Sequence, residues 1–149
     1  MDIQDWTGEA WMLLDVFVAL VLGGLIGFER EKSDKPAGLR THMLISASAC
    51  LFLFLGIHIS HSVSRQLSAE AMGVDPTRIL HAIIVGISFI GAGTILKSRE
   101  GMVIRYLTTA ATILAAAAVG IAVGLHLYVL AVGATLLTLL VSFVVGYFA

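Results

Sequence analysis

Charged residues are scarce in this sequence, and their scarcity excludes an ordinary water-soluble fold. Asp, Glu, Lys and Arg make up 13% of the 149 residues, whereas soluble domains carry about 25%. Hydrophobic residues make up 58% and fall in long runs broken by short polar clusters, which is typical of a chain that spans a bilayer. The formal net charge is -1. Because Lys and Arg form no extended stripe, nucleic acid is not an expected partner.

Cysteine and N-terminal basic residues are also nearly missing. The single cysteine, Cys50, lies in an apolar run and can form no internal disulfide, so we interpret it as a small core residue. The first ten residues include Asp2, Asp5 and Glu9 but no Lys or Arg. They therefore lack the basic region of a cleaved signal peptide, and we expect the first hydrophobic segment to stay in the mature protein.

Catalytic motifs are absent from the sequence. It contains no nucleophile with a partnered base, no phosphate-binding loop of the Walker type and no HExxH motif. We therefore expect no enzymatic activity, no catalytic residues and no cofactor, apart from the Mg²⁺ considered below.

Five apolar segments are long enough to cross a bilayer. A helix rises 1.5 Å per residue, so a hydrocarbon core of about 30 Å needs roughly 17 to 25 residues. The segments cover about residues 11–28, 42–59, 79–96, 106–124 and 125–148. Only Gly124-Leu125-His126 separates the last two, which predicts a tight hairpin, and the four alanines at 115–118 predict an enclosed fourth helix. The expected fold is an all-α integral membrane protein with one transmembrane domain, residues 1–149.

The basic residues predict an orientation in the membrane. Four lie in the first predicted loop and three in the third, which together make seven of the nine in the chain. Cytoplasmic loops carry the excess of Lys and Arg, so both loops are predicted to be cytoplasmic. The N-terminus would then face outward and the C-terminus inward. The basic residues are Arg30, Lys32, Lys35 and Arg40 in the first loop, Arg65 and Arg78 in the second, and Lys97, Arg99 and Arg105 in the third.

Small residues recur four residues apart in the first and fourth predicted helices, and glycines are concentrated in the third. Lipid tails give helices no hydrophobic reason to associate, so membrane helices pack through residues that let their backbones approach. We expect helix contacts at these positions, within one chain or in a homo-oligomer; for the third helix a flexible or ion-lining segment is the alternative. The positions are Ala19, Gly23 and Gly27, then Gly86, Gly91 and Gly93, then Ala116, Gly120 and Gly124.

Two arginines border the first predicted loop. Successive helix residues are rotated by about 100°, so Arg30 shares a face with Gly23 and Gly27 whereas Glu29 points elsewhere. We predict a cytoplasmic cluster of Arg30 and Arg40, closed by Glu29 or by Arg105, that binds an anionic lipid or a partner's acidic group. The alternative is simple anchoring of arginine at the headgroups.

Polar residues on the opposite side of the membrane are fewer. Asp75 and Pro76 are typical of a helix N-cap and first position. Asp75 is also an oxygen ligand that Mg²⁺ could meet, although Arg78 would compete for it. Asp15 lies one turn into the first span, either as a functional carboxylate or at the interface.

The remaining polar side chains have structural interpretations. Thr108 and Thr109 begin the fourth helix and can bond across helices or to the preceding turn. His58 and His61, three residues apart, are interpreted as interfacial rather than as a metal site, and the isolated His81 and His126 likewise.

Four ordered segments give the chain a family resemblance. They are GGLIGFEREKSDKPAGLRTHML at 23–44, DPTRI at 75–79, GISFIGAGTIL at 86–96 and LTTAATILAAAAVGIAVG at 107–124. Together they resemble the MgtC/SapB family. The resemblance implies a bacterial inner-membrane protein linked to Mg²⁺ limitation and to survival of pathogens inside host cells. Its characteristic positions match Glu29, Arg30, Arg40, Asp75, Arg78, Thr108 and Thr109.

The resemblance implies a regulator rather than a transporter, with an ATP synthase among the proposed partners. A transporter or channel for Mg²⁺ or another cation is the alternative. Three positions depart from the family pattern: a basic residue is common where Asp15 stands, glycine where Tyr106 stands and tryptophan where Leu114 stands. Many members also continue into a cytoplasmic domain beyond the last span, whose function cannot be transferred to a sequence that ends at Ala149.

Overall fold

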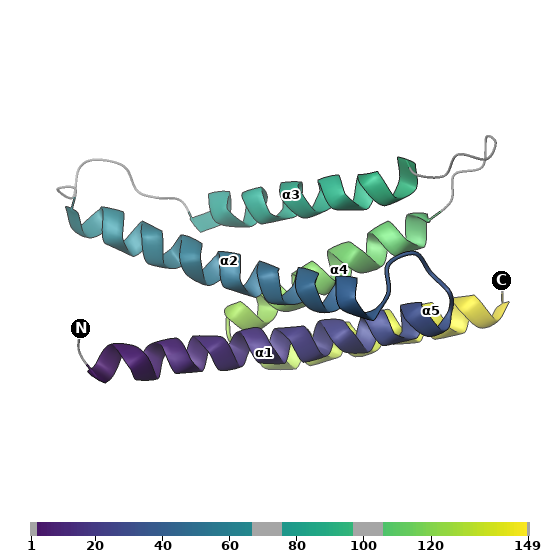
Figure 1. Ribbon diagram of the computed structural model, residues 1–149, viewed down its shortest axis with the longest axis horizontal. Helices are drawn as coiled ribbons and strands as arrows, with labels where there is room; N and C mark the ends of the chain where they lie inside the picture. The colour runs from purple at the N-terminus through teal and green to yellow at the C-terminus, as the bar shows by residue number, and fades with distance from the viewer. Residues whose placement is uncertain (1–2, 67–75, 97–105, 149) are drawn as a thin grey trace.

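The computed structural model describes residues 3–66, 76–96 and 106–148, and over these ranges it is all-helical (Figure 1). The predicted α-helical class is confirmed. Each predicted segment corresponds to one helix, and α1 and α2 continue into the flanking polar sequence. The helices are α1 (Ile3–Lys32), α2 (Leu39–Gln66), α3 (Pro76–Leu96), α4 (Leu107–Gly124) and α5 (Tyr128–Phe148).

Four of these helices are long and apolar enough to cross a membrane. Their candidate spans are Thr7–Lys32, Leu39–Ser62, Thr77–Ile95 and Leu107–Gly124, whereas the apolar stretch of α5, Tyr128–Val144, is shorter. Large hydrophobic side chains point outward, with Phe89 of α3 82% exposed and Val129 of α5 89% exposed. Such a surface is unfavourable in water and suits a protein surrounded by lipid.

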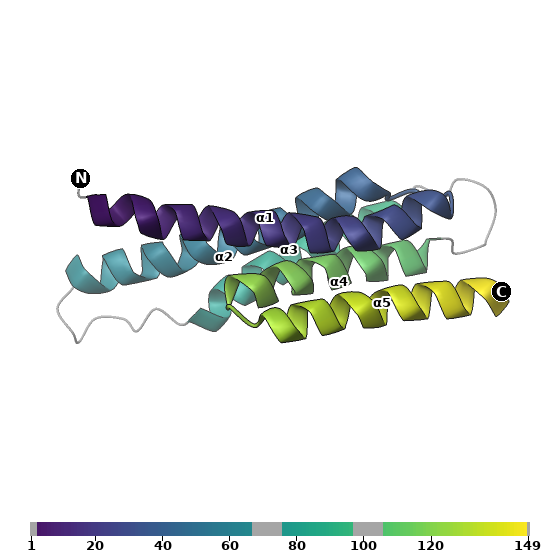
Figure 2. The ribbon, with the colours of Figure 1, turned by 90° about the horizontal axis from the view of Figure 1, so that it is seen from below.

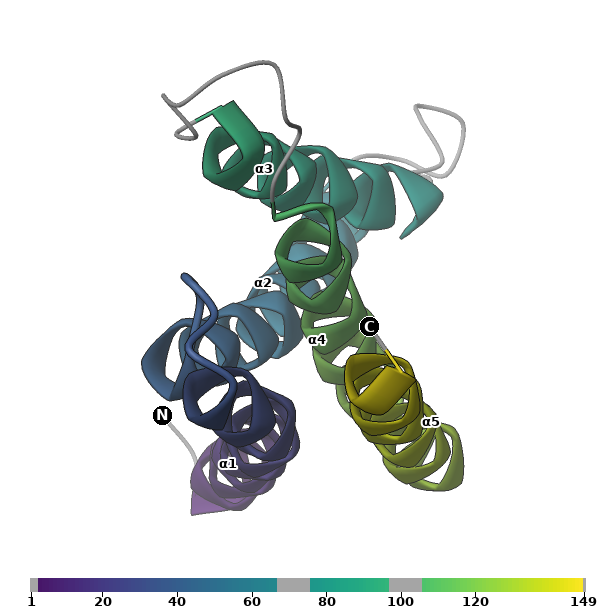
Figure 3. The same ribbon diagram turned by 90° about the vertical axis from the view of Figure 1, so that its right-hand side faces the viewer.

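The fourth helix lies at the centre of the bundle. In α4, 61% of the residues are buried, against 33% or less in the other three candidate spans. It contacts α1, α2, α3 and α5, and the end-on view shows it between them (Figure 3). The prediction of an enclosed fourth helix is confirmed. Its alanines and glycines make it thin, so the neighbouring helices approach it closely.

Two tight turns connect α1 to α2 and α4 to α5. After α1, Asp34 takes a left-handed conformation with φ 51°, and the Lys35 N–H donates to the Arg30 carbonyl over 3.0 Å. After α4, His126 has φ 59° and the Leu127 N–H donates to the Ala122 carbonyl over 2.9 Å. The predicted hairpin between the last two helices is thus confirmed. The N- and C-termini of the chain lie at opposite ends of the molecule (Figure 2).

Glycines bring three helices into backbone contact. A Cβ at Gly23 of α1 would lie 2.5 Å from the His42 carbonyl oxygen and from the Ser46 Cβ of α2, closer than real Cβ atoms come. A Cβ at Gly27 would lie 2.8 Å from the Leu39 Cα. From the α4 side, a Cβ at Gly120 would collide with the Ser46 carbonyl. Ser46 is therefore the point at which α1, α2 and α4 meet.

The glycines of α3 are placed differently. A Cβ at Gly86 or Gly93 would meet nothing within 4 Å, and one at Gly91 would make an ordinary contact with Ala110. The contacts expected of Gly86 and Gly93 are thus not formed within the described part of this chain. The reason is position, since α3 lies at the edge of the bundle and packs only on α2 and α4 among the described helices.

Gly120→Ala should destabilise the protein. The added methyl group would press on the backbone of Ser46, which cannot rotate away, and such overpacking costs about 1–3 kcal/mol. Gly133→Ala on α5 is the matched control, because a Cβ there meets nothing within 4 Å and a helical Gly→Ala change should add about 0.5–1 kcal/mol. Thermal unfolding in detergent micelles measures both. Equal shifts in the two variants would contradict the contact.

Candidate functional site

A buried ion pair closes the end of α1. The Arg30 Nη2 donates to Glu29 Oε1 over 2.7 Å, and Nε donates to Oε2 over 2.5 Å. Their side chains are only 6% and 10% exposed. Ser33 Oγ donates a third bond to Glu29 Oε1 over 3.0 Å. The two parallel guanidinium bonds are the geometry in which arginine binds carboxylate most strongly.

The prediction that Glu29 points away from the face of Arg30 is wrong. Helical rotation determines only the direction in which each side chain leaves the backbone, and the long stem of Arg30 lets its guanidinium reach the neighbouring carboxylate. Arg30 is buried, as its position on the Gly23 and Gly27 face indicated.

Arg40 does not join this pair. It is exposed in the first turn of α2, and the hydrogen bonds to Glu29 come from Arg30 and Ser33 instead. Arg105, the other predicted member of the cluster, lies outside the described residues. The start of α2 is held by Glu31, whose Oε2 accepts the Leu39 N–H over 2.8 Å.

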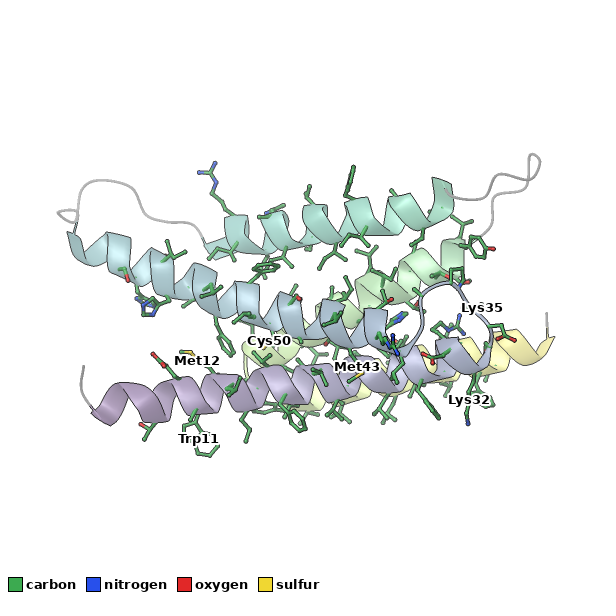
Figure 4. The ribbon with its side chains drawn as sticks, viewed as in Figure 1. Trp11, Met12, Lys32, Lys35, Met43 and Cys50 are labelled. Atoms are coloured by element: carbon green, nitrogen blue, oxygen red, sulfur yellow. The ribbon has the colours of Figure 1, made fainter. Side chains whose placement is uncertain are left out.

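Lysines near the α1–α2 loop lie at its periphery. Figure 4 shows Lys35 in the loop and Lys32 on the side of α1 that faces away from α2. The Lys32 Nζ lies 4.6 Å from the centroid of the Phe28 ring, a cation–π contact at an exposed site. These positions agree with surface anchoring.

A buried histidine connects α2 to α4, and the sequence analysis missed it. His42 is fully buried. Its Nδ1 lies 2.9 Å from the Gly38 carbonyl oxygen. Since a carbonyl oxygen can only accept, Nδ1 is the donor of this hydrogen bond. The other ring nitrogen, Nε2, lies 3.1 Å from Thr112 Oγ1. The only signal in the sequence was a histidine at the start of an apolar run, with a threonine in an alanine-rich helix.

The threonine pair of the fourth helix is split by the fold. Thr108 is exposed, whereas Thr109 is fully buried and its Oγ1 has no hydrogen-bond partner among the described residues. The bond across helices is made by Thr112, whose hydroxyl also lies 3.0 Å from the Thr109 carbonyl. Tyr106 precedes the helix with φ 71°, a conformation that favours the glycine common at this position in the resembled family.

A second buried carboxylate lies toward the opposite end of α1. Asp15 is 3% exposed, and its Oδ1 accepts the Tyr128 hydroxyl over 2.8 Å. His126 Nδ1 lies 3.4 Å from Asp15 Oδ2 and 3.1 Å from the Tyr128 hydroxyl. The Asp15 carboxylate is thus buried, with Tyr128 and His126 as its partners. His126, interpreted as isolated, lies next to this carboxylate.

Cys50 packs close to this region. It is fully buried, which confirms its interpretation as a core residue, and Figure 4 shows it directed from α2 toward α1. The surrounding core cluster joins apolar side chains of α1, α2, α4 and α5, including Ala19, Ile26, Phe54, Val119, Val123 and Ala131.

The predicted outer cation site is described only in part. Asp75 lies outside the described residues, α3 begins at Pro76 as predicted, and Arg78 is exposed in its first turn. His58 and His61 are exposed near the end of α2. Within the part of the chain that the structure describes, no three His, Cys, Asp or Glu residues gather as a metal site would require.

The fold, with several helices long and apolar enough to cross a membrane, defines a helical membrane protein, and within the described residues Glu29 pairs with Arg30 and Asp15 with Tyr128. Within that class, this chain belongs to the MgtC family, whose sequence profile matches residues 16–149. The family consists of bacterial membrane proteins, and the predicted resemblance is confirmed.

Curated relatives from three bacteria are similar over most of the chain. The "Putative magnesium transporter YhiD" of Escherichia coli K12 is 38% identical over 132 residues, covering 89% of this chain and 59% of the relative. SapB of Bacillus subtilis 168 is 37% identical over 140 residues, with coverages of 94% and 58%. MgtC of Salmonella typhimurium LT2 is 38% identical over 128 residues, with coverages of 85% and 49%.

The chain therefore spans about half to three fifths of the length of these relatives. No solved structure matches it.

Replacing Glu29 and Arg30 together should cost less stability than the sum of the two single replacements. Glu29→Ala or Arg30→Ala leaves the other charge buried and unpaired, which costs about 3–5 kcal/mol, whereas the double variant leaves no unpaired charge. The double variant should therefore be more stable than the sum of the single losses implies.

Chemical unfolding in detergent micelles gives the three free energies of unfolding. Lys32→Ala, which removes an exposed charge next to the pair, is the control and should change stability by about 0.5 kcal/mol or less. A coupling below about 0.5 kcal/mol between Glu29 and Arg30 would mean that the two changes act independently.

Proposed function

We propose that this protein is a non-enzymatic component of the bacterial inner membrane that regulates or associates with other membrane proteins during Mg²⁺ limitation or growth inside host cells. One observation carries the proposal. At Ser46, Gly23 and Gly120 bring the backbones of three helices into close contact. A bundle packed in this way offers its outer surface, rather than an internal path, for function.

The outer surface supports association within the membrane. Side chains such as Phe89 on α3 and Val129 on α5 are exposed and apolar, and they are suited to contact lipid, a second copy of the chain or the helices of another protein. Arg40, exposed in the first turn of α2, is available to an anionic lipid or a partner's acidic group. An ATP synthase is one partner proposed within the family.

Cation transport is the second candidate function. It is favoured by Asp15, a buried carboxylate within the first candidate span, since such residues often mark ion pathways. The relative YhiD is named as a "Putative magnesium transporter", which also favours cation transport. Against it, Asp15 is engaged by Tyr128 and His126, and a conduction pathway needs a series of polar groups.

One pair of measurements separates the two functions. Purified protein in liposomes should give no selective flux of Mg²⁺, H⁺ or K⁺ above that of protein-free vesicles. The same chain should restore growth in low Mg²⁺ to a strain that lacks its own family member. Selective flux that Asp15→Asn abolishes would establish transport instead, and failure to restore growth would remove the link to Mg²⁺ limitation.

We further propose that the N-terminus faces outward and the C-terminus faces the cytoplasm, with α5 as a fifth span. The α1–α2 loop, the end of α3 and the start of α4 lie at the same end of the molecule (Figure 1). Four of the six basic residues in the described ranges, Arg30, Lys32, Lys35 and Arg40, lie in or beside the α1–α2 loop at that end. Such an excess favours the cytoplasmic side.

Cysteine labelling in intact cells tests this orientation. In a Cys50→Ala background, His61→Cys at the outer end of α2 should react with a membrane-impermeant maleimide, and Ser33→Cys in the first loop should react only after lysis. Both native side chains are exposed. The reverse labelling pattern would overturn the orientation.

A further inference from the structure

A groove with a volume of about 890 Å³ lies between α2 and α3. Its walls are almost entirely apolar and include Leu44, Phe52, Ile83, Gly86 and Ile87, with Arg78 among the lining residues where α3 begins. Both helices are candidate membrane spans, so the groove opens toward lipid.

We propose that this groove binds one acyl chain of an anionic phospholipid, whose phosphate is held by Arg78. The length of the groove fits a single acyl chain. Its α3 lining runs from Arg78 to Ile90, which at 1.5 Å per residue is about 18 Å. One leaflet of the hydrocarbon core is about 15 Å thick, so a chain whose headgroup lies at Arg78 would fill the groove.

The contact between α2 and α3 selects a lipid chain over a protein helix. Near Arg78, Ile79 packs directly on Gly56, where an added Cβ would lie 2.6 Å from Ile79 Cγ2. The two helices therefore touch at this end, and a third helix with a diameter of about 10 Å cannot enter between them. An unbranched hydrocarbon chain needs much less width, and it replaces the dispersion contacts that an empty groove would lose.

The charge at the end of the groove selects the headgroup. Arg78 is exposed, and the first turn of α3 from Pro76 onward contains no acidic residue, Asp75 lying outside the described residues. Its planar guanidinium can bind two phosphate oxygens at once, and a basic residue near the membrane surface favours anionic over zwitterionic lipid. Arg78 would thus position the headgroup, and the apolar walls would hold the chain.

Lipid retention by the delipidated protein tests both parts of the proposal. The probes are phosphatidylglycerol and phosphatidylcholine with identical acyl chains, detected by native mass spectrometry. The wild-type protein should retain phosphatidylglycerol about fivefold better, the factor expected from one basic residue at the surface. Arg78→Gln should retain the two lipids equally.

Two matched variants test the groove itself. A Cβ at Gly86 or at Gly93 meets nothing within 4 Å, but only Gly86 lines the groove. Gly86→Phe should lose retention of both lipids, and Gly93→Phe should behave as the wild type. Ala82 also lines the groove. If Gly86→Phe does not fold, Ala82→Leu replaces it as the variant that fills the groove.

Three outcomes would overturn the proposal. The first is an absence of headgroup preference in the wild-type protein, and the second is a preference that survives in Arg78→Gln. The third is an equal effect of Gly86→Phe and Gly93→Phe on lipid retention. If groove substitution changes the oligomeric mass instead, the occupant is a second copy of the chain and the lipid assignment is wrong.

Discussion

The close approach of the α2 backbone to α1 and α4 at Ser46 is the contact on which the rest of the bundle depends. Lipid tails solvate an apolar helix as well as another helix does, so association must come from close packing. Gly23 and Gly120 permit that packing because neither carries a side chain where Ser46 lies. A larger residue at either position would separate the helices and displace the polar side chains of α2, such as His42, from their partners on neighbouring helices.

The buried polar contacts follow from this packing. His42 lies one turn before Ser46, touches the Gly27 position and reaches Thr112 of α4. Farther along the bundle, α4 ends at a turn that brings Tyr128 to Asp15. Buried polar and ionised groups are tolerated when they are paired, and these groups find their partners on adjacent helices. Pairing of this kind stabilises one arrangement of helices over others in an otherwise uniform apolar sequence.

The third helix stands apart from this tightly packed group. It shares glycine-rich composition with α1 and α4, yet Gly86 and Gly93 face open space, and α3 packs only on α2 and α4 among the described helices. Surface that the chain does not cover itself is covered by lipid or by another protein. The association with membrane proteins and the lipid site proposed above both use such surface, whereas the core around Ser46 only supports it.

Sequence alone determined the five helices of the described residues and the bounds of α3, α4 and α5 to within three residues, because hydropathy and length can be read along the chain. It missed the polar extensions of α1 and α2. Pro76 indicated the start of α3, and Gly124-Leu125-His126 indicated the hairpin. The sequence could not determine which small residues lie at helix contacts. Gly23 and Gly86 both lie in glycine-rich helical segments, and only the placement of neighbouring helices distinguishes them. Nor could the sequence pair Asp15 with Tyr128, 113 residues away. Helical periodicity defines faces within one helix, but only the tertiary arrangement decides which faces and which distant side chains meet.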